Sequence, residues 1–124
     1  MILEQKKLLE EFAKKHSLKE RTIEGFKKNR DRCYKEDVEI GIPPLNGYPK
    51  DTLVCFFRSH SLIFERSYRY SPCIRTHVSI CYKDHDTENM LDLECVGYYQ
   101  LDVDENGESF DDWFVLESQF SPED

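Results

Sequence analysis

Residues 91–120 read LDLECVGYYQLDVDENGESFDDWFVLESQF and carry the plainest structural signal in the chain. The sequence DENG, residues 104–107, stands between two segments rich in aromatic and β-branched side chains. An Asn-Gly pair in such a setting is typical of a tight β-hairpin. We therefore predict strands over 91–103 and 110–120, with a bulge or close packing at Gly97. The unbroken apolar run 113–116 predicts that the second strand is central or buried on both faces.

Three further strand-like segments precede this hairpin, over 52–58, 62–70 and 74–83. Polar breaks at 59–61, 71–72 and 84–89 separate them. The alternation in the third segment predicts one apolar face made of Ile74, Thr76, Val78, Ile80 and Tyr82. Short connections between consecutive strands favour an antiparallel meander, so we predict a single sheet of about five strands.

The N-terminal third predicts helices. Residues 2–16 show helical spacing of apolar side chains, with Lys and Glu on the other face. The motif S-x-x-E at Ser17 and Glu20 is typical of a capping box, so we expect a second helix from Leu18 that frays after Lys28. Gly25 should weaken that helix. We expect a short edge strand over 35–42 and a proline-rich loop over 42–49.

These elements predict an α+β fold, in which two N-terminal helices pack on a single curved antiparallel β-sheet. Residues 1–124 should form a single domain, with a helical part over 1–34 and the sheet over 51–120. A more strongly curved sheet that encloses a pocket against the helices is the alternative.

Residues 12–26, FAKKHSLKERTIEGF, resemble a DNA-binding helix-turn-helix. In that resemblance Ala13 is the small residue where the helices meet, Ser17 stands in the turn, and Leu18, Ile23 and Phe26 are the apolar positions of the second helix. The resemblance implies a nucleic-acid binder. A plain helical hairpin packed on the sheet explains the same pattern, and the net charge of −8 opposes nucleic-acid binding.

Charge is distributed unevenly along the chain. Residues 1–35 contain 11 Lys and Arg and 6 acids, whereas residues 84–124 contain 14 Asp and Glu and no Lys or Arg. A concentrated acidic surface attracts a basic partner and selects it. The predicted partner-binding residues are Asp102, Asp104, Glu105, Glu108, Asp111, Asp112 and Trp113.

The sequence thus favours a small binding protein over an enzyme. The favoured function is a cytoplasmic inhibitor of the immunity-protein type, whose acidic C-terminal surface neutralises a basic protein such as a nuclease toxin. The alternatives are a small-ligand domain or enzyme with a pocket between sheet and helices, and a helix-turn-helix nucleic-acid binder. No apolar run is long enough to span a membrane, and the N-terminus does not resemble a secretory signal.

No cofactor or metal is predicted. Residues 102–107 match the first half of a calcium-binding loop, but position twelve is Trp113. His77, Cys81 and His85 recur every four residues, which in a strand is too far apart for one metal ion. The five cysteines are expected to be reduced and mostly buried: Cys33, Cys55, Cys73, Cys81 and Cys95. The arginines of the strand region, Arg58, Arg66, Arg69 and Arg75, are expected to pair with the acidic segment.

Overall fold

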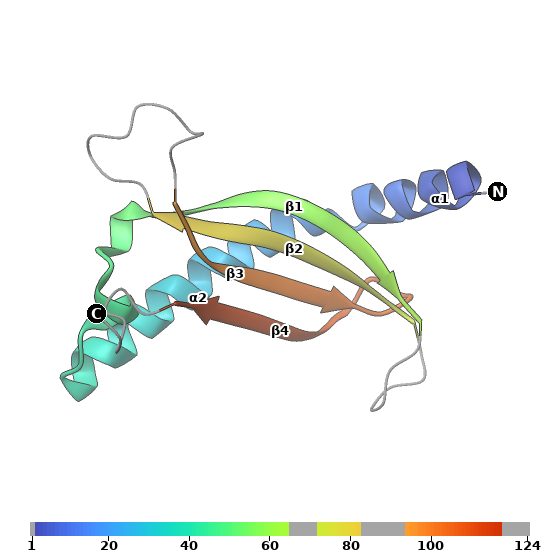
Figure 1. Cartoon of the computed structure of the whole chain (residues 1–124). Helices are drawn as coiled ribbons and strands as arrows, with labels where there is room; N and C mark the ends of the chain where they lie inside the picture. The colour runs from blue at the N-terminus through green and yellow to red at the C-terminus, as the bar shows by residue number, and fades with distance from the viewer. Residues whose placement is uncertain (1, 65–71, 83–93, 118–124) are drawn as a thin grey trace.

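The computed structural model describes residues 2–64, 72–82 and 94–117. Two helices, α1 (Ile2–Lys15) and α2 (Leu18–Ile40), are followed by the short 3₁₀ turns η1 (Pro44–Gly47) and η2 (Lys50–Thr52). Four strands then form one open antiparallel meander in the order β1-β2-β3-β4 (Figure 1): β1 (Leu53–Ile63), β2 (Cys73–Tyr82), β3 (Glu94–Val103) and β4 (Ser109–Leu116). The predicted α+β class and meander are confirmed, with four strands instead of about five.

The difference in strand number arises within β1. A strand break was predicted at residues 59–61, but β1 continues through them and pairs with β2 along its whole length. The register shifts between Phe57 and Ser59, so that Arg58 is the extra residue of a β-bulge. The polar residues therefore mark an irregularity inside one strand. The rest of the predicted second strand, residues 65–70, lies outside the described part of the chain.

Strand β4 lies at the edge of the sheet, where it pairs only with β3. The prediction of a central strand was wrong. Residues 113–116 are all apolar because successive side chains of the strand pack against different neighbours on the two faces of the sheet. Phe114 points toward the helices and stacks on Phe26 at a ring separation of 6.1 Å, whereas Trp113 lies on the outer face beneath Arg75.

Helix α2 is much longer than predicted, and the expected strand over 35–42 was wrong because the helix continues to Ile40. Leu18, Thr22 and Phe26 are fully buried, and Asn29 and Cys33 continue the same stripe at helical spacing. Thr22 Oγ1 donates to the Leu18 carbonyl oxygen at 2.6 Å, and Asn29 Nδ2 donates to the carbonyl of residue 25 at 2.8 Å. The packing face thus includes polar side chains that a search for apolar periodicity passes over.

The junction between the helices is also different from the prediction. Ser17 adopts a left-handed conformation (φ 52°, ψ 44°) and makes no side-chain cap, so the predicted capping box was wrong. Its N–H donates to the Lys14 carbonyl, which ends α1 in the manner of a C-terminal cap. Ala13, near this turn, packs in a second cluster with Ile74 and Val103 of the sheet. The first part of α1 extends past the end of the sheet (Figure 1), and its residues Ile2, Leu3 and Leu8 are exposed.

The main core lies between α2 and one face of the sheet. It contains Phe26, Leu53, Val78, Ile80 and Tyr99, among other residues. The face predicted for β2 is confirmed. Opposite β3 the register shifts between Ile80 and Cys81, which buries Val96 and leaves Cys95 exposed on the outer face. The expectation that the cysteines are mostly buried was wrong, because only Cys73 and Cys81 are buried.

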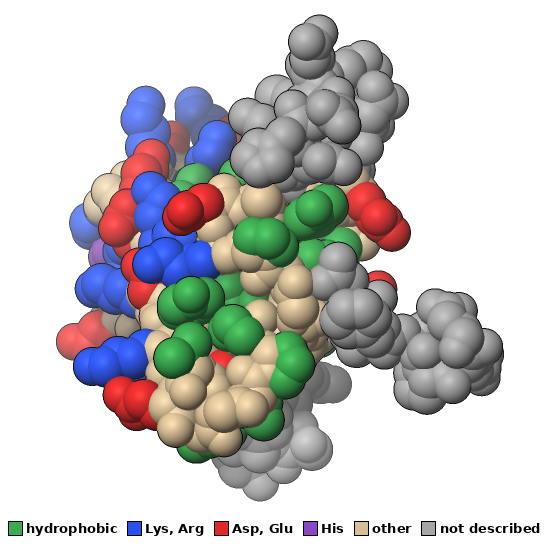
Figure 2. Space-filling view, turned by 90° about the vertical axis from the view of Figure 1, so that its left-hand side faces the viewer, with side chains coloured by type: hydrophobic (Ala, Val, Ile, Leu, Met, Phe, Trp, Pro, Cys, Tyr) green, Lys and Arg blue, Asp and Glu red, His purple; other side chains and the backbone are tan. Residues whose placement is uncertain are grey.

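Apolar side chains also reach the surface where α2 ends. Figure 2 shows this end of the molecule, with hydrophobic side chains gathered beside a row of Lys and Arg. Val38, Ile40 and Ile42 are exposed there. Despite its length, α2 is too charged to span a membrane, and α1, the other helix in the described residues, is no better suited.

Candidate functional site

The turn between β3 and β4 is held rigidly by its own hydrogen bonds. Asp104 Oδ1 accepts the backbone N–H groups of Asn106 and Glu108 at 2.9 and 3.0 Å, and the Gly107 N–H donates to the Asp104 carbonyl oxygen at 2.9 Å. Gly107 has φ of 80°, a conformation that suits glycine. The predicted Asn-Gly turn is present, and Asp104 serves as its internal brace.

The same turn is fixed to the helix junction. Arg21 Nη1 donates to the Gly107 carbonyl oxygen at 2.8 Å and to the His16 carbonyl oxygen at 3.3 Å. A Cβ atom added at Gly107 would lie 2.2 Å from His16 Nδ1, so the His16 ring packs directly on the turn. The sequence did not reveal this anchor, since 86 residues separate Arg21 from Gly107.

Asp102 is removed from the surface. Its side chain is fully buried and receives two hydrogen bonds from Arg75, at 3.0 and 3.1 Å. The Arg75 guanidinium also lies 5.0 Å above the Trp113 ring. This ion pair confirms the expected cross-strand pairing for Arg75 and makes Asp102 and the half-buried Trp113 part of the sheet structure. Arg58 instead donates to Ser79 Oγ at 2.7 Å.

Asp111 and Asp112 project from opposite faces of the edge strand. Asp112 is on the helix-facing side, where Oδ2 accepts the Tyr99 hydroxyl at 2.7 Å and Asn29 Nδ2 at 3.3 Å. Burial, together with this hydrogen bond to a carboxylate, raises the pKa of Tyr99 well above its usual range. Asp111 lies on the outer face and accepts the Asp112 backbone N–H at 2.9 Å.

The remaining predicted residues, Glu105 and Glu108, are exposed at the tip of the turn. Within the described ranges, no Lys, Arg or His nitrogen lies within 4.0 Å of the carboxylates of the turn or of β4, which belong to Asp104, Glu105, Glu108, Asp111 and Asp112. Acids of the helices do have such neighbours, for example Glu10 beside Lys6 and Glu36 beside Arg32. We call the set of Asp104, Glu105, Glu108, Asp111 and Asp112 the acidic hairpin. None of its carboxylates forms an ion pair with another described residue.

The possible metal ligands have other contacts. Asp102 is paired with Arg75, and Asp104 Oδ1 is occupied by two backbone N–H groups. His77 stacks on Tyr98 at 5.1 Å, and His85 lies outside the described residues. In 2–64, 72–82 and 94–117, no three His, Cys, Asp or Glu side chains come together as a metal site would require.

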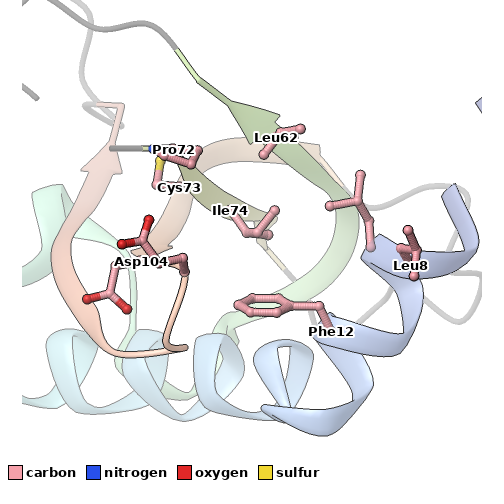
Figure 3. A pocket seen from close by; sticks show the side chains of 9 residues that line it. Leu8, Phe12, Leu62, Pro72, Cys73, Ile74 and Asp104 are labelled. Atoms are coloured by element: carbon pink, nitrogen blue, oxygen red, sulfur yellow. The ribbon is translucent and has the colours of Figure 1, made fainter. Parts of the chain in front are cut away.

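Two hollows flank α1. The first has a volume of about 250 Å³ and is bounded by the helix, the distal ends of β1 and β2, and the acidic hairpin (Figure 3). Leu8, Phe12, Leu62 and Ile74 make it apolar, and the Asp104 side chain lies at one side (Figure 3). Glu105 also lines it. The second is wider, about 650 Å³, and lies on the other side of α1 near Phe57 and His60. Both are open to solvent.

Within the acidic hairpin, Asp104, Glu105 and Glu108 lie together in the turn, and Asp111 and Asp112 lie on opposite faces of the strand that follows. Asp102 and Trp113 are separated from these carboxylates by burial and by Arg75. The sequence did not distinguish these two groups, because all seven predicted partner-binding residues lie within one hairpin. Comparisons with protein families, with curated proteins and with solved structures found no match to this chain.

Proposed function

We propose that this protein binds a basic protein partner through the acidic hairpin and inhibits it. A nucleic-acid-handling enzyme such as a nuclease toxin is the class of partner that suits an acidic surface, because its own substrate site must be basic. The protein would then act as a small cytoplasmic inhibitor of the immunity-protein type. The observation that carries this proposal is that, within the described residues, no Lys, Arg or His nitrogen lies within 4.0 Å of these five carboxylates.

Rigidity supports the same proposal. Binding costs less free energy when the contacting groups are already ordered in the free protein. Asp104 Oδ1 accepts two backbone N–H groups of the turn, and Arg21 donates to the Gly107 carbonyl oxygen. These contacts order the turn in the free protein, before a partner binds. The backbone that carries Glu105 and Glu108 is therefore ordered in the free protein, which favours fast association and selection of a complementary partner.

A small-ligand function has less support. The apolar hollow beside α1, about 250 Å³, is slightly below the ~300–1,000 Å³ typical of ligand pockets. The wider hollow has sufficient volume but borders the charged residues Lys6, Glu10 and Lys19 on an open surface. The half-buried His60 lines the wider hollow, but both hollows are open to solvent, so the acidic hairpin remains the better candidate.

The test is affinity capture from a host lysate, washed at low and at high salt. The parent chain is compared with the variant Glu105→Lys/Glu108→Lys and with Glu4→Lys/Glu11→Lys, which makes the same charge change on exposed positions of α1. We expect one basic protein on the parent and on the α1 variant, with loss from the hairpin variant and weakening at high salt. Equal capture by all three chains, or no basic protein on any, would reject the proposal.

Once a partner is identified, association rates give a sharper test. The hairpin variant should associate at least about tenfold more slowly than the parent at low salt, and the difference should shrink as salt is added. The melting temperature should stay unchanged, since neither Glu105 nor Glu108 has a side-chain partner among the described residues.

A further inference from the structure

Cys81 and Cys95 face each other across β2 and β3. They are direct partners in the register, beside the bulge at Val96, and their sulfur atoms are 3.2 Å apart. Residues directly opposed in an antiparallel pair have Cα atoms about 4.5–5.5 Å apart. That separation falls within the range of about 4.4–6.8 Å that a disulfide spans. A bond between these sulfurs therefore requires no large movement of the backbone.

The two thiols differ in environment. Cys95 is exposed on the outer face, and Arg58 Nη2 donates to its sulfur at 3.5 Å. Cys81 is buried, and burial together with the hydrogen bond to Cys95 raises the pKa of its thiol to about 12. Cys81 consequently keeps its proton near neutral pH, and Cys95 is the sulfur that a dissolved oxidant meets first.

We propose that Cys81 and Cys95 form a redox modification site, which a hydroperoxide converts reversibly into a cross-strand disulfide. The Cys95 sulfur attacks one peroxide oxygen, the O–O bond breaks, and Cys95 becomes a sulfenic acid while water or an alcohol leaves. The Cys81 sulfur then displaces the hydroxyl group, which departs as water with the Cys81 proton. The two thiols lose two electrons in total, and the peroxide gains them. A dithiol reverses the change by thiol–disulfide exchange.

Arg58 has a position that suits the first step. Its guanidinium holds the Cys95 sulfur from one side and Ser79 Oγ from the other, which fixes the outer face around the thiol. It can also interact with the negative charge that passes to the departing peroxide oxygen during the attack. Cys33 on α2 and Cys55 on the helix-facing side of β1 also have cationic neighbours, Arg32 for the first and Lys27 and Arg30 for the second. Neither has a second sulfur opposed to it in its described contacts, so both provide controls.

The disulfide would close the connection between β2 and β3. A crosslink over a loop of this length restricts the unfolded chain, so the oxidised protein should melt about 5–10 °C above the reduced one. It would also fix the register of the two central strands beside the bulge.

The experiment treats the fully reduced chain with a small excess of hydrogen peroxide. Free thiols should fall from five to three, with a mass loss of about 2 Da, a crosslinked Cys81–Cys95 peptide and full reversal by dithiothreitol. Cys33→Ser should fall from four to two. Cys81→Ser should instead accumulate a Cys95 sulfenic acid that dimedone labels, because the second thiol is missing.

Several results would contradict the proposed disulfide between Cys81 and Cys95. Retention of all five thiols, a crosslink that involves Cys33, Cys55 or Cys73, or a disulfide only between two chains would overturn the proposal. So would a Cys95→Ser variant that still loses two thiols. Circular dichroism of each variant before oxidation confirms that it is folded, and the dimedone result does not depend on the disulfide forming.

Discussion

Tyr98 and Tyr99 are neighbours in β3, yet they belong to two different kinds of surface. Tyr99 points toward α2, is 1% exposed and donates its hydroxyl to Asp112, whereas Tyr98 lies on the outer face against His77. The helix-facing side is stabilised by apolar volume. The outer side, which no helix of the described residues covers, is stabilised by paired polar groups such as Arg75 and Asp102. In this two-layer fold, the stability of the helix-facing side of the sheet therefore depends on apolar packing, and that of the outer side on hydrogen bonds and ion pairs between polar side chains.

The largest difference between the faces should appear on removing core volume. Phe26 is 1% exposed and stacks on Phe114, so Phe26→Ala should lower the free energy of unfolding by about 3–5 kcal/mol. Phe64, which is 68% exposed, is the control, and Phe64→Ala should change stability by less than about 0.5 kcal/mol. Urea unfolding measures both. Similar losses for the two variants would contradict the division into faces.

Breaking the ion pair of the outer face should have the next largest effect. Arg75→Met removes both hydrogen bonds to the buried Asp102 carboxylate, and we expect a loss of about 3 kcal/mol. The value is at the low end for a buried pair because the Arg75 side chain is 28% exposed. Arg75→Met/Asp102→Leu should recover at least half of the loss, since no carboxylate is then left buried. A double variant as unstable as the single one would show that packing, and not the charge, dominates there.

The two tyrosines allow a smaller and closely matched test. Tyr99→Phe removes the hydroxyl that donates to Asp112 and should lower the free energy of unfolding by about 1 kcal/mol. Asp112 is exposed and can bind water instead, which limits the loss. Tyr98→Phe should have almost no effect. Thermal unfolding of the pair of variants measures the difference, and equal changes would refute it.

The smallest effect concerns acid sensitivity on the helix-facing side. Burial lowers the pKa of His60 from 6.5, an effect that Glu20 opposes and Lys19 supports. Below pH 6.5 the unfolded chain binds this proton more readily than the folded one, so stability falls as pH drops through that value toward the folded pKa. His60→Gln should therefore flatten the dependence of Tm on pH between about 7 and 5. An unchanged pH profile in the variant would exclude His60 as its source.

Segments with a regular alternation of apolar and polar residues could be predicted from the sequence, and segments with an irregularity could not. Strand β2 alternates without interruption, so its buried face could be assigned from the sequence. In β1 and β3 a bulge shifts the register, and a simple alternation then assigns Cys95 to the wrong face. Helix α2 was shortened in the prediction because its buried stripe includes Thr22, Asn29 and Cys33.

The candidate site was predictable only as a region. A high density of Asp and Glu in one hairpin shows where negative charge gathers, but the sequence does not say which carboxylate finds a partner. Asp102 and Asp104 are two residues apart, and one is buried by Arg75 while the other braces a turn. The pairing depends on the register between β2 and β3, which runs without a shift from Ile74 opposite Val103 to Ile80 opposite Gly97.

Gly25 sets how closely α2 approaches the sheet. A Cβ atom at this position would lie 2.5 Å from the Tyr99 hydroxyl oxygen, within a ring that is buried and bonded to Asp112. Replacement of a helical glycine by alanine is a common route to a more thermostable protein, with gains of up to about 1 kcal/mol. Here the same substitution would have to displace Tyr99. Any effort to engineer a hardier version of this protein should therefore leave Gly25 unchanged and seek its gains on the exposed side of α2.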